Sequence, residues 1–263
     1  MEAADNDATN LELASEEPPK EVIQLEEIEV QPEESKTEKD PMVTDSNDRK
    51  GFVRKVYSLL AVQLGVTAVG VASTSLVEEA RAGLLETAFL CYPCMALSLG
   101  LVIGIYCWQG LARRVPYNYV ASLAFTLLQT YIVAYFSAFY APVTVCAAAL
   151  LTIGVTGGLT VYACAARTDF TICHSLSFVL IAALLVFTGL TIWIGSLVVT
   201  FVYCLFGALV FGVMLVVDTQ LIIGGKFEAL TYDDYILAAL LLYVDVISMF
   251  VYVLKLIGTK LFS

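Results

Sequence analysis

Seven apolar runs, each close to the length needed to cross a bilayer, follow one another from Gly51 onward. A helix needs about 20 apolar residues to span membrane hydrocarbon. The runs lie at residues 56–77, 87–108, 118–140, 143–165, 171–192, 197–223 and 235–257. Because the connections between them are short, consecutive helices must pack as antiparallel neighbours. The sequence therefore predicts an all-α integral membrane protein, a seven-transmembrane-helix bundle.

Composition excludes a soluble domain. The mean hydropathy is +0.81 and only 15% of residues are charged, whereas charged residues make up about a quarter of a soluble domain. We expect the lipid bilayer as the surroundings, no nucleic-acid partner and no tightly bound cofactor.

The net charge of −11 comes from the first 50 residues. That segment holds 16 acids and 5 bases, which gives −11, and residues 51–263 hold 9 of each. A segment this polar cannot bury enough apolar surface to order itself. We predict a disordered acidic cytosolic tail at 1–50 and a transmembrane domain at 51–263. The aliphatic residues of EVIQLEEIEV leave open a docking motif within the tail. No signal peptide is expected, so the first span serves as the anchor.

Basic residues at the span ends predict the orientation, because lysine and arginine are enriched on the cytosolic side of membranes. Eight of them share one side: Arg49, Lys50, Arg54, Lys55, Arg113, Arg114, Arg167 and Lys226. The other side has Arg81 within a glutamate-rich loop, so the N-terminus should be cytosolic. Seven full crossings would place Lys255 and Lys260 outside, which leaves open a last segment that enters partly and returns. We favour seven crossings.

An acid in the middle of the last run is the main functional signal. A charged aspartate at the centre of a membrane helix costs about 2.5–3.5 kcal/mol, which makes Asp245 a candidate functional residue. Asp218 lies near the end of the preceding run. Counted from the cytosolic ends of their helices, the two acids lie roughly 9 and 16 Å deep. Helix tilt can close that difference, so we predict that Asp218 and Asp245 meet.

Two acids that meet in hydrocarbon cannot both ionise cheaply, so one should hold a proton near neutral pH unless a cation lies between them. Arg113 or Arg114, at the cytosolic edge, is the candidate latch. Protons or a divalent cation could compete to open such a latch, with Asp218 and Asp245 as transient calcium ligands. The alternative is a purely structural ion pair that joins three helices.

An enzyme is not expected. Intramembrane aspartyl proteases also use two membrane aspartates, but they resemble a Tyr-Asp plus Gly-x-Gly-Asp pattern, and the flanks here read VVDTQ and YVDVI. Glycines at close spacing predict tight helix contacts instead, since small residues let membrane helices approach. The glycine pairs are Gly100 with Gly104, Gly154 with Gly158, and Gly207 with Gly212.

Four stretches carry a family resemblance: FVRKVYSLLAVQL, ARRVPYN, VVDTQLIIGGKFEAL and DDYILAALLLYVDVISMFVYVLKLIG. Over about residues 51–260 the chain resembles the transmembrane Bax-inhibitor motif proteins, Lifeguard branch. The resemblance implies a seven-helix fold, a pH-sensitive calcium leak in an internal membrane such as the endoplasmic reticulum or Golgi, and protection from apoptosis. Calcium would be the permeant ion, and apoptosis-regulating membrane proteins are possible partners.

By the same resemblance, Asp218 and Asp245 look like paired pH and calcium sensors, and Arg113 or Arg114 looks like the latch. The tail departs from the pattern, because Lifeguard relatives often carry Pro- and Tyr-rich tails and this one is acidic. A second function class therefore stays open, a non-conducting membrane scaffold that restrains death signalling through protein partners.

Overall fold

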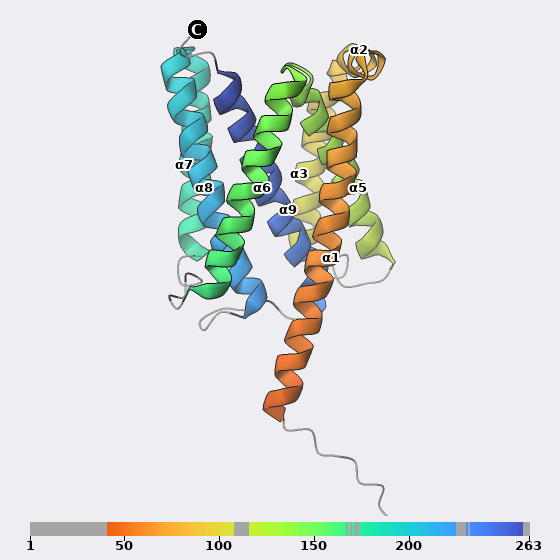
Figure 1. Cartoon of the computed structure of the whole chain (residues 1–263), viewed down its shortest axis with the longest axis vertical. Coiled ribbons are helices and arrows are strands. Elements are labelled where there is room, and N and C mark those ends of the chain that lie inside the picture. The colour runs from red at the N-terminus through yellow and green to blue at the C-terminus, as the bar shows by residue number, and fades with distance from the viewer. Residues whose placement is uncertain are drawn as a thin grey trace, which may run out of the picture. The chain divides into compact units, whose positions relative to one another are not determined.

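The computed structural model of the chain describes residues 41–107, 116–166, 168, 170, 174–224, 230 and 232–259. Over these ranges the chain is helical and contains no strand (Figure 1). The helices are α1 (Pro41–Leu76), α2 (Glu78–Glu86), η1 (Ala88–Leu90), α3 (Cys91–Cys107), α5 (Tyr117–Ser137), α6 (Pro142–Ala165), α7 (His174–Ile194), α8 (Leu197–Ile223), η3 (Tyr232–Asp234) and α9 (Tyr235–Gly258).

Seven helices in the described part of the chain are long and apolar enough to cross a membrane, which confirms the predicted bundle. The boundaries differ most at the first span, Asp48–Leu76, and the fifth, Leu176–Ile194; the second span, Ala88–Ile105, joins η1 to α3. The last span is one continuous helix of 24 residues, about 36 Å long. A helix of that length without a break supports a full crossing and not a partial entry that returns.

Helix α1 starts earlier than the predicted domain boundary. It begins at Pro41, so residues 41–50, assigned to the tail from composition, are helical. The remainder of the tail, with its EVIQLEEIEV stretch, lies outside the described residues. Helix α2 also forms where a loop was expected. Glu78 and Glu79 occupy its first turn, where negative charge is favourable beside the positive end of the helix dipole.

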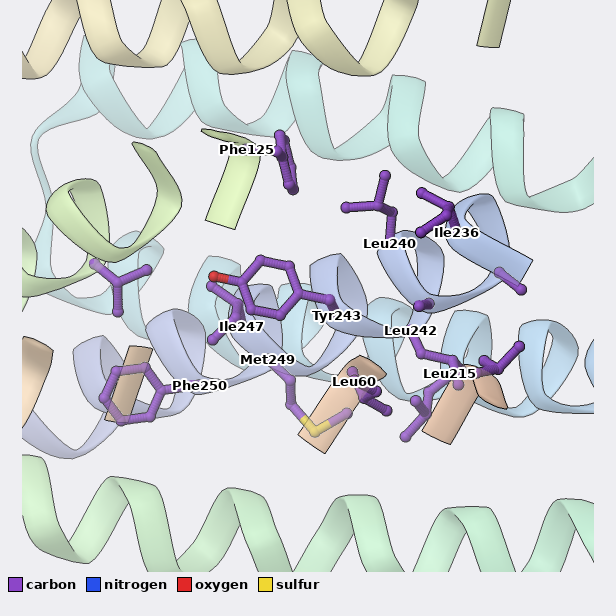
Figure 2. Close-up of a cluster of buried hydrophobic side chains, with 14 of the residues drawn as sticks. Leu60, Phe125, Leu215, Ile236, Leu240, Leu242, Tyr243, Ile247, Met249 and Phe250 are labelled. Carbon is purple, nitrogen blue, oxygen red and sulfur yellow. The ribbon is translucent and has the colours of Figure 1, made fainter. Parts of the chain in front are cut away.

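Helix α9 is the centre of the bundle and packs against α1, α5, α6 and α8. Half of its apolar window is buried, against 6% for α7, which packs mainly against α8. Figure 2 shows Tyr243, Ile247 and Met249 of α9 within the main apolar cluster. An acid on this helix therefore lies in the interior of the bundle.

The glycine prediction is right for one pair. A Cβ at Gly207 would lie 2.5 Å from the Tyr252 ring, and one at Gly212 would lie 3.3 Å from Leu159, so α8 uses both to approach its neighbours. For the other pairs the described residues leave open space within 4 Å: Gly100, Gly104, Gly154 and Gly158. For these four glycines the predicted helix contacts are wrong, because no neighbouring helix of the described residues lies against them.

Candidate functional site

The structure brings the two membrane acids together. Asp218 lies on α8 and is 5% exposed, and Asp245 lies on α9 and is 1% exposed. Their carboxyl groups face each other within reach of a hydrogen bond. The two acids therefore lie together across α8 and α9, and their role as sensors stays a prediction. Because both are removed from water, the pair is most stable when it shares a proton or binds a cation.

Several buried oxygen atoms lie close to this pair, at the turn of α8 that carries Asp218. Within the described part of the chain, three buried oxygen atoms on or beside this turn of α8 make no hydrogen bond: Asp245 Oδ2, the Thr219 hydroxyl and the Tyr57 hydroxyl. Tyr57 of α1 faces Thr219. Buried polar atoms are usually satisfied, and the two hydroxyls lie close enough to pair with each other, which leaves Asp245 Oδ2 as the oxygen able to bind a proton or a cation.

Four consecutive residues of α8 each contact a different part of the bundle. Asp218 faces α9 and Thr219 faces α1. The Gln220 side chain accepts a 2.6 Å hydrogen bond from the Phe170 backbone N–H and donates one of 3.0 Å to the Thr168 carbonyl. Gln220 thereby anchors the connection between α6 and α7. The fourth residue, Leu221, accepts a hydrogen bond from the Arg49 side chain of α1 through its backbone carbonyl.

Arg49 joins the last turn of α8 to the connection that leads into α9. Its guanidinium donates 2.7 Å hydrogen bonds to the carbonyls of Leu221 and Leu230, and the Leu230 N–H donates to the Leu221 carbonyl. Helix α8 ends there in Gly224, whose φ of +104° is a left-handed conformation that suits glycine. A cation at the negative end of a helix is favourable. Arg49 therefore fixes how α8 leads into α9, and with it the placement of the acid pair.

The predicted latch residues Arg113 and Arg114 lie outside the described residues. Sequence reasoning used Arg49 only for orientation and gave Gln220 no role. Only their positions in the sequence point to a role for them near the acid pair. Gln220 lies two residues after Asp218, and Arg49 lies at the predicted cytosolic end of the first span. The described residues contain no group of three or more His, Cys, Asp or Glu side chains. Asp218 and Asp245 alone offer two carboxylates, fewer oxygens than the six to eight that calcium takes.

The arrangement defines a class: a multi-pass helical membrane protein whose central helix carries one of two paired intramembrane acids. The chain belongs to the family described as "Inhibitor of apoptosis-promoting Bax1", whose family model matches residues 49–261.

Curated relatives agree with this assignment. The chain is 32% identical to Protein lifeguard 3 of Homo sapiens over 224 residues, which cover 82% of this chain and 71% of the relative. It is 30% identical to Protein lifeguard 3 of Mus musculus, again over 224 residues that cover 82% of this chain and 71% of the relative. It is 31% identical to Protein lifeguard 4 of Mus musculus over 208 residues, 79% of this chain and 84% of the relative. These relatives support the Lifeguard branch within the family.

Proposed function

We propose that this protein is a pH-sensitive calcium leak channel of an internal membrane, the endoplasmic reticulum or Golgi, and that it restrains apoptosis. The observation that carries the proposal is the contact between Asp218 and Asp245 inside the bundle. Ionisable groups in membrane helices are costly and mark ion or proton pathways. The family description and the names of the lifeguard relatives support the link to cell death.

In the proposed mechanism, a shared proton holds the acid pair together. Loss of that proton leaves two carboxylates that repel each other in a low-dielectric interior, which favours separation of α8 from α9. Calcium competes with the proton for the same oxygens and passes without being held tightly, because the pair supplies too few ligands for a high-affinity site. Arg113 or Arg114 is the proposed cationic latch, and Arg49 limits how far the helices separate.

The proposed orientation places the N-terminus in the cytosol, as the positions of the basic residues favour. The acid pair then lies nearer the cytosolic end of α8, since Asp218 is six positions from Gly224, about 9 Å along the helix.

Calcium flux into liposomes that hold the purified protein, recorded over a range of pH, tests the leak. Asp218→Asn and Asp245→Asn should each alter the flux and flatten its pH dependence. Asp233→Asn is the matched control, because it makes the same chemical change at an exposed position just before α9. If both buried variants retain the pH profile of the wild type, the gating model is wrong.

A second function is a non-conducting scaffold that restrains death signalling through protein partners. The strongly acidic first 50 residues, with 16 acids and 5 bases, favour it, because a charged tail is a typical interaction segment. Deletion of residues 1–40 leaves helix α1 complete and separates the two functions. Loss of protection from a death stimulus with unchanged flux supports the scaffold. If protection is lost in Asp245→Asn and kept in the deletion, the result supports the channel.

A further inference from the structure

A deep apolar groove lies on the opposite half of the bundle from the Arg49 contacts. It has a volume of about 410 Å³ and is lined by residues of α1, α5, α6 and α9. Its floor is formed by buried side chains, including Val71 of α1, Val145 of α6, and Ile247 and Phe250 of α9. The two α9 residues belong to the apolar cluster in Figure 2. The groove therefore reaches the central helix of the bundle.

The groove opens toward the outside of the bundle and not toward its interior. Leu76 on α1 and Ile153 on α6 border it and are 78% and 67% exposed, whereas the floor residues are buried. Helices α1 and α6 form the two sides in Figure 1, with α9 between them in that view. Both side helices are membrane spans, so the opening faces hydrocarbon.

The length of the groove matches one leaflet of a bilayer. Along α1 it extends from Leu64 to Leu76, about 18 Å at 1.5 Å per residue. Half of a hydrocarbon core about 30 Å thick is roughly 15 Å. A helix with side chains is about 10 Å across, so a groove of this volume would hold little more than one helical turn. An extended hydrocarbon chain fits these dimensions better than a helix of another protein.

One polar atom lies near the outer end of the groove. The hydroxyl oxygen of Ser75 is buried and makes no hydrogen bond within the described residues, and Ser75 lines the groove beside Leu76. We propose that the groove binds one acyl chain of a membrane phospholipid, and that the Ser75 hydroxyl donates a hydrogen bond to the ester carbonyl of that chain. The ester lies where a lipid's hydrocarbon meets its headgroup, the same level as this end of the span.

A bound chain would touch the helix that carries the sensor acid. Val246, which follows Asp245, also lines the groove. The lipid site is nevertheless independent of the proposed calcium leak. It rests on the apolar lining, the opening and the Ser75 hydroxyl, and none of these involves the acid pair.

Photolabelling of the full chain in phosphatidylcholine vesicles tests the site. The probe is a phosphatidylcholine with a diazirine in the middle of one acyl chain, and labelled residues are located by mass spectrometry after digestion. Labels should concentrate on residues 64–76 and 142–153. Labels spread evenly over exposed helix faces, such as that of α7, would overturn the proposal. Competition by cholesterol but not by excess phosphatidylcholine would also overturn it, because the occupant would then be a sterol.

Two substitutions sharpen the test. Ala149→Trp fills the groove from α6, and the neighbouring Leu150→Trp places the same indole on an exposed face that does not line it. The indole takes up the space of the chain in Ala149→Trp, so labelling of residues 64–76 should be lost in that variant and kept in Leu150→Trp. Ser75→Ala should weaken labelling by the ester-linked probe more than labelling by a diazirine alkane. Equal labelling in both tryptophan variants would contradict the proposal.

Discussion

Arg49 donates a 2.7 Å hydrogen bond to the carbonyl oxygen of Leu221, a residue 172 positions later in the chain. The same guanidinium reaches the carbonyl of Leu230 at 2.7 Å. One side chain of α1 therefore closes the connection between the two helices that carry Asp218 and Asp245. Because Leu230 lies only five positions before Tyr235, where α9 begins, these bonds limit how far the start of α9 can move from the end of α8.

We predict that Arg49→Ala lowers the stability of the bundle and raises calcium flux. Hydrogen bonds from a charged donor contribute about 1.5–3 kcal/mol each, and Arg49 is half-buried, so we expect a loss of about 2 kcal/mol for the two bonds together. Thermal unfolding in nanodiscs and flux in liposomes measure the two effects.

Arg54→Ala is the control for Arg49, because Arg54 lies on the same helix and its side chain is exposed. Arg49→Lys should fall between the wild type and Arg49→Ala, since lysine keeps the charge but lacks the planar fork that reaches two carbonyls. If Arg49→Ala unfolds at the same temperature as Arg54→Ala, the closure role is wrong.

We predict that the acid pair makes the stability of the folded protein fall as pH rises. A pair that shares one proton loses it at higher pH, and two carboxylates at hydrogen-bonding distance then repel each other by a few kcal/mol. Asp245→Asn removes one charge, so its melting temperature should change less between mildly acidic and mildly alkaline pH than that of the wild type.

Asp233→Asn should retain the wild-type dependence, because Asp233 is exposed. The measurement is a melting curve at each pH in the same lipid. A wild-type protein that melts at one temperature across this range would show that the pair does not share a proton near neutral pH.

The acid pair could be predicted from the sequence because the bilayer constrains both helices. Membrane-length runs give each residue a depth, and two acids at similar depth in hydrocarbon must find a partner. Arg49 and Gln220 could not be predicted in the same way. Their hydrogen bonds involve backbone groups of distant segments, including Leu221, Leu230 and Phe170. Every residue except proline carries the same backbone groups, so nothing in the sequence marks the partners.

The glycines show a second limit of sequence reasoning. Spacing identifies small residues on one helix but does not say whether that face meets a helix or lipid. A Cβ at Gly207 would meet the Tyr252 ring, whereas one at Gly154 would meet no neighbouring side chain or helix within 4 Å among the described residues. Both positions look alike in sequence, because apolar residues favour either environment in a membrane.

We predict that Gly207→Ala destabilises the bundle by about 1–3 kcal/mol, the usual cost of overpacking. The added methyl would lie 2.5 Å from the Tyr252 ring. That ring cannot move freely, since the Tyr252 hydroxyl is 2.9 Å from the Tyr203 hydroxyl. Gly154→Ala is the control and should be neutral or stabilising, because alanine favours helices. Thermal unfolding separates the two variants, and equal melting temperatures would contradict the packing argument.

We predict that Gln220→Leu releases the connection between α6 and α7 from α8. The leucine cannot accept the 2.6 Å hydrogen bond from the Phe170 N–H or donate to Thr168, and loss of the buried partner costs about 1–3 kcal/mol. Hydrogen exchange at Phe170 should therefore become roughly 5- to 150-fold faster. Gln220→Glu keeps the acceptor and loses the donor, so Phe170 should remain protected in that variant. Unchanged exchange at Phe170 in Gln220→Leu would show that the anchor lies elsewhere, and that this turn of α8 joins fewer elements than its hydrogen bonds indicate.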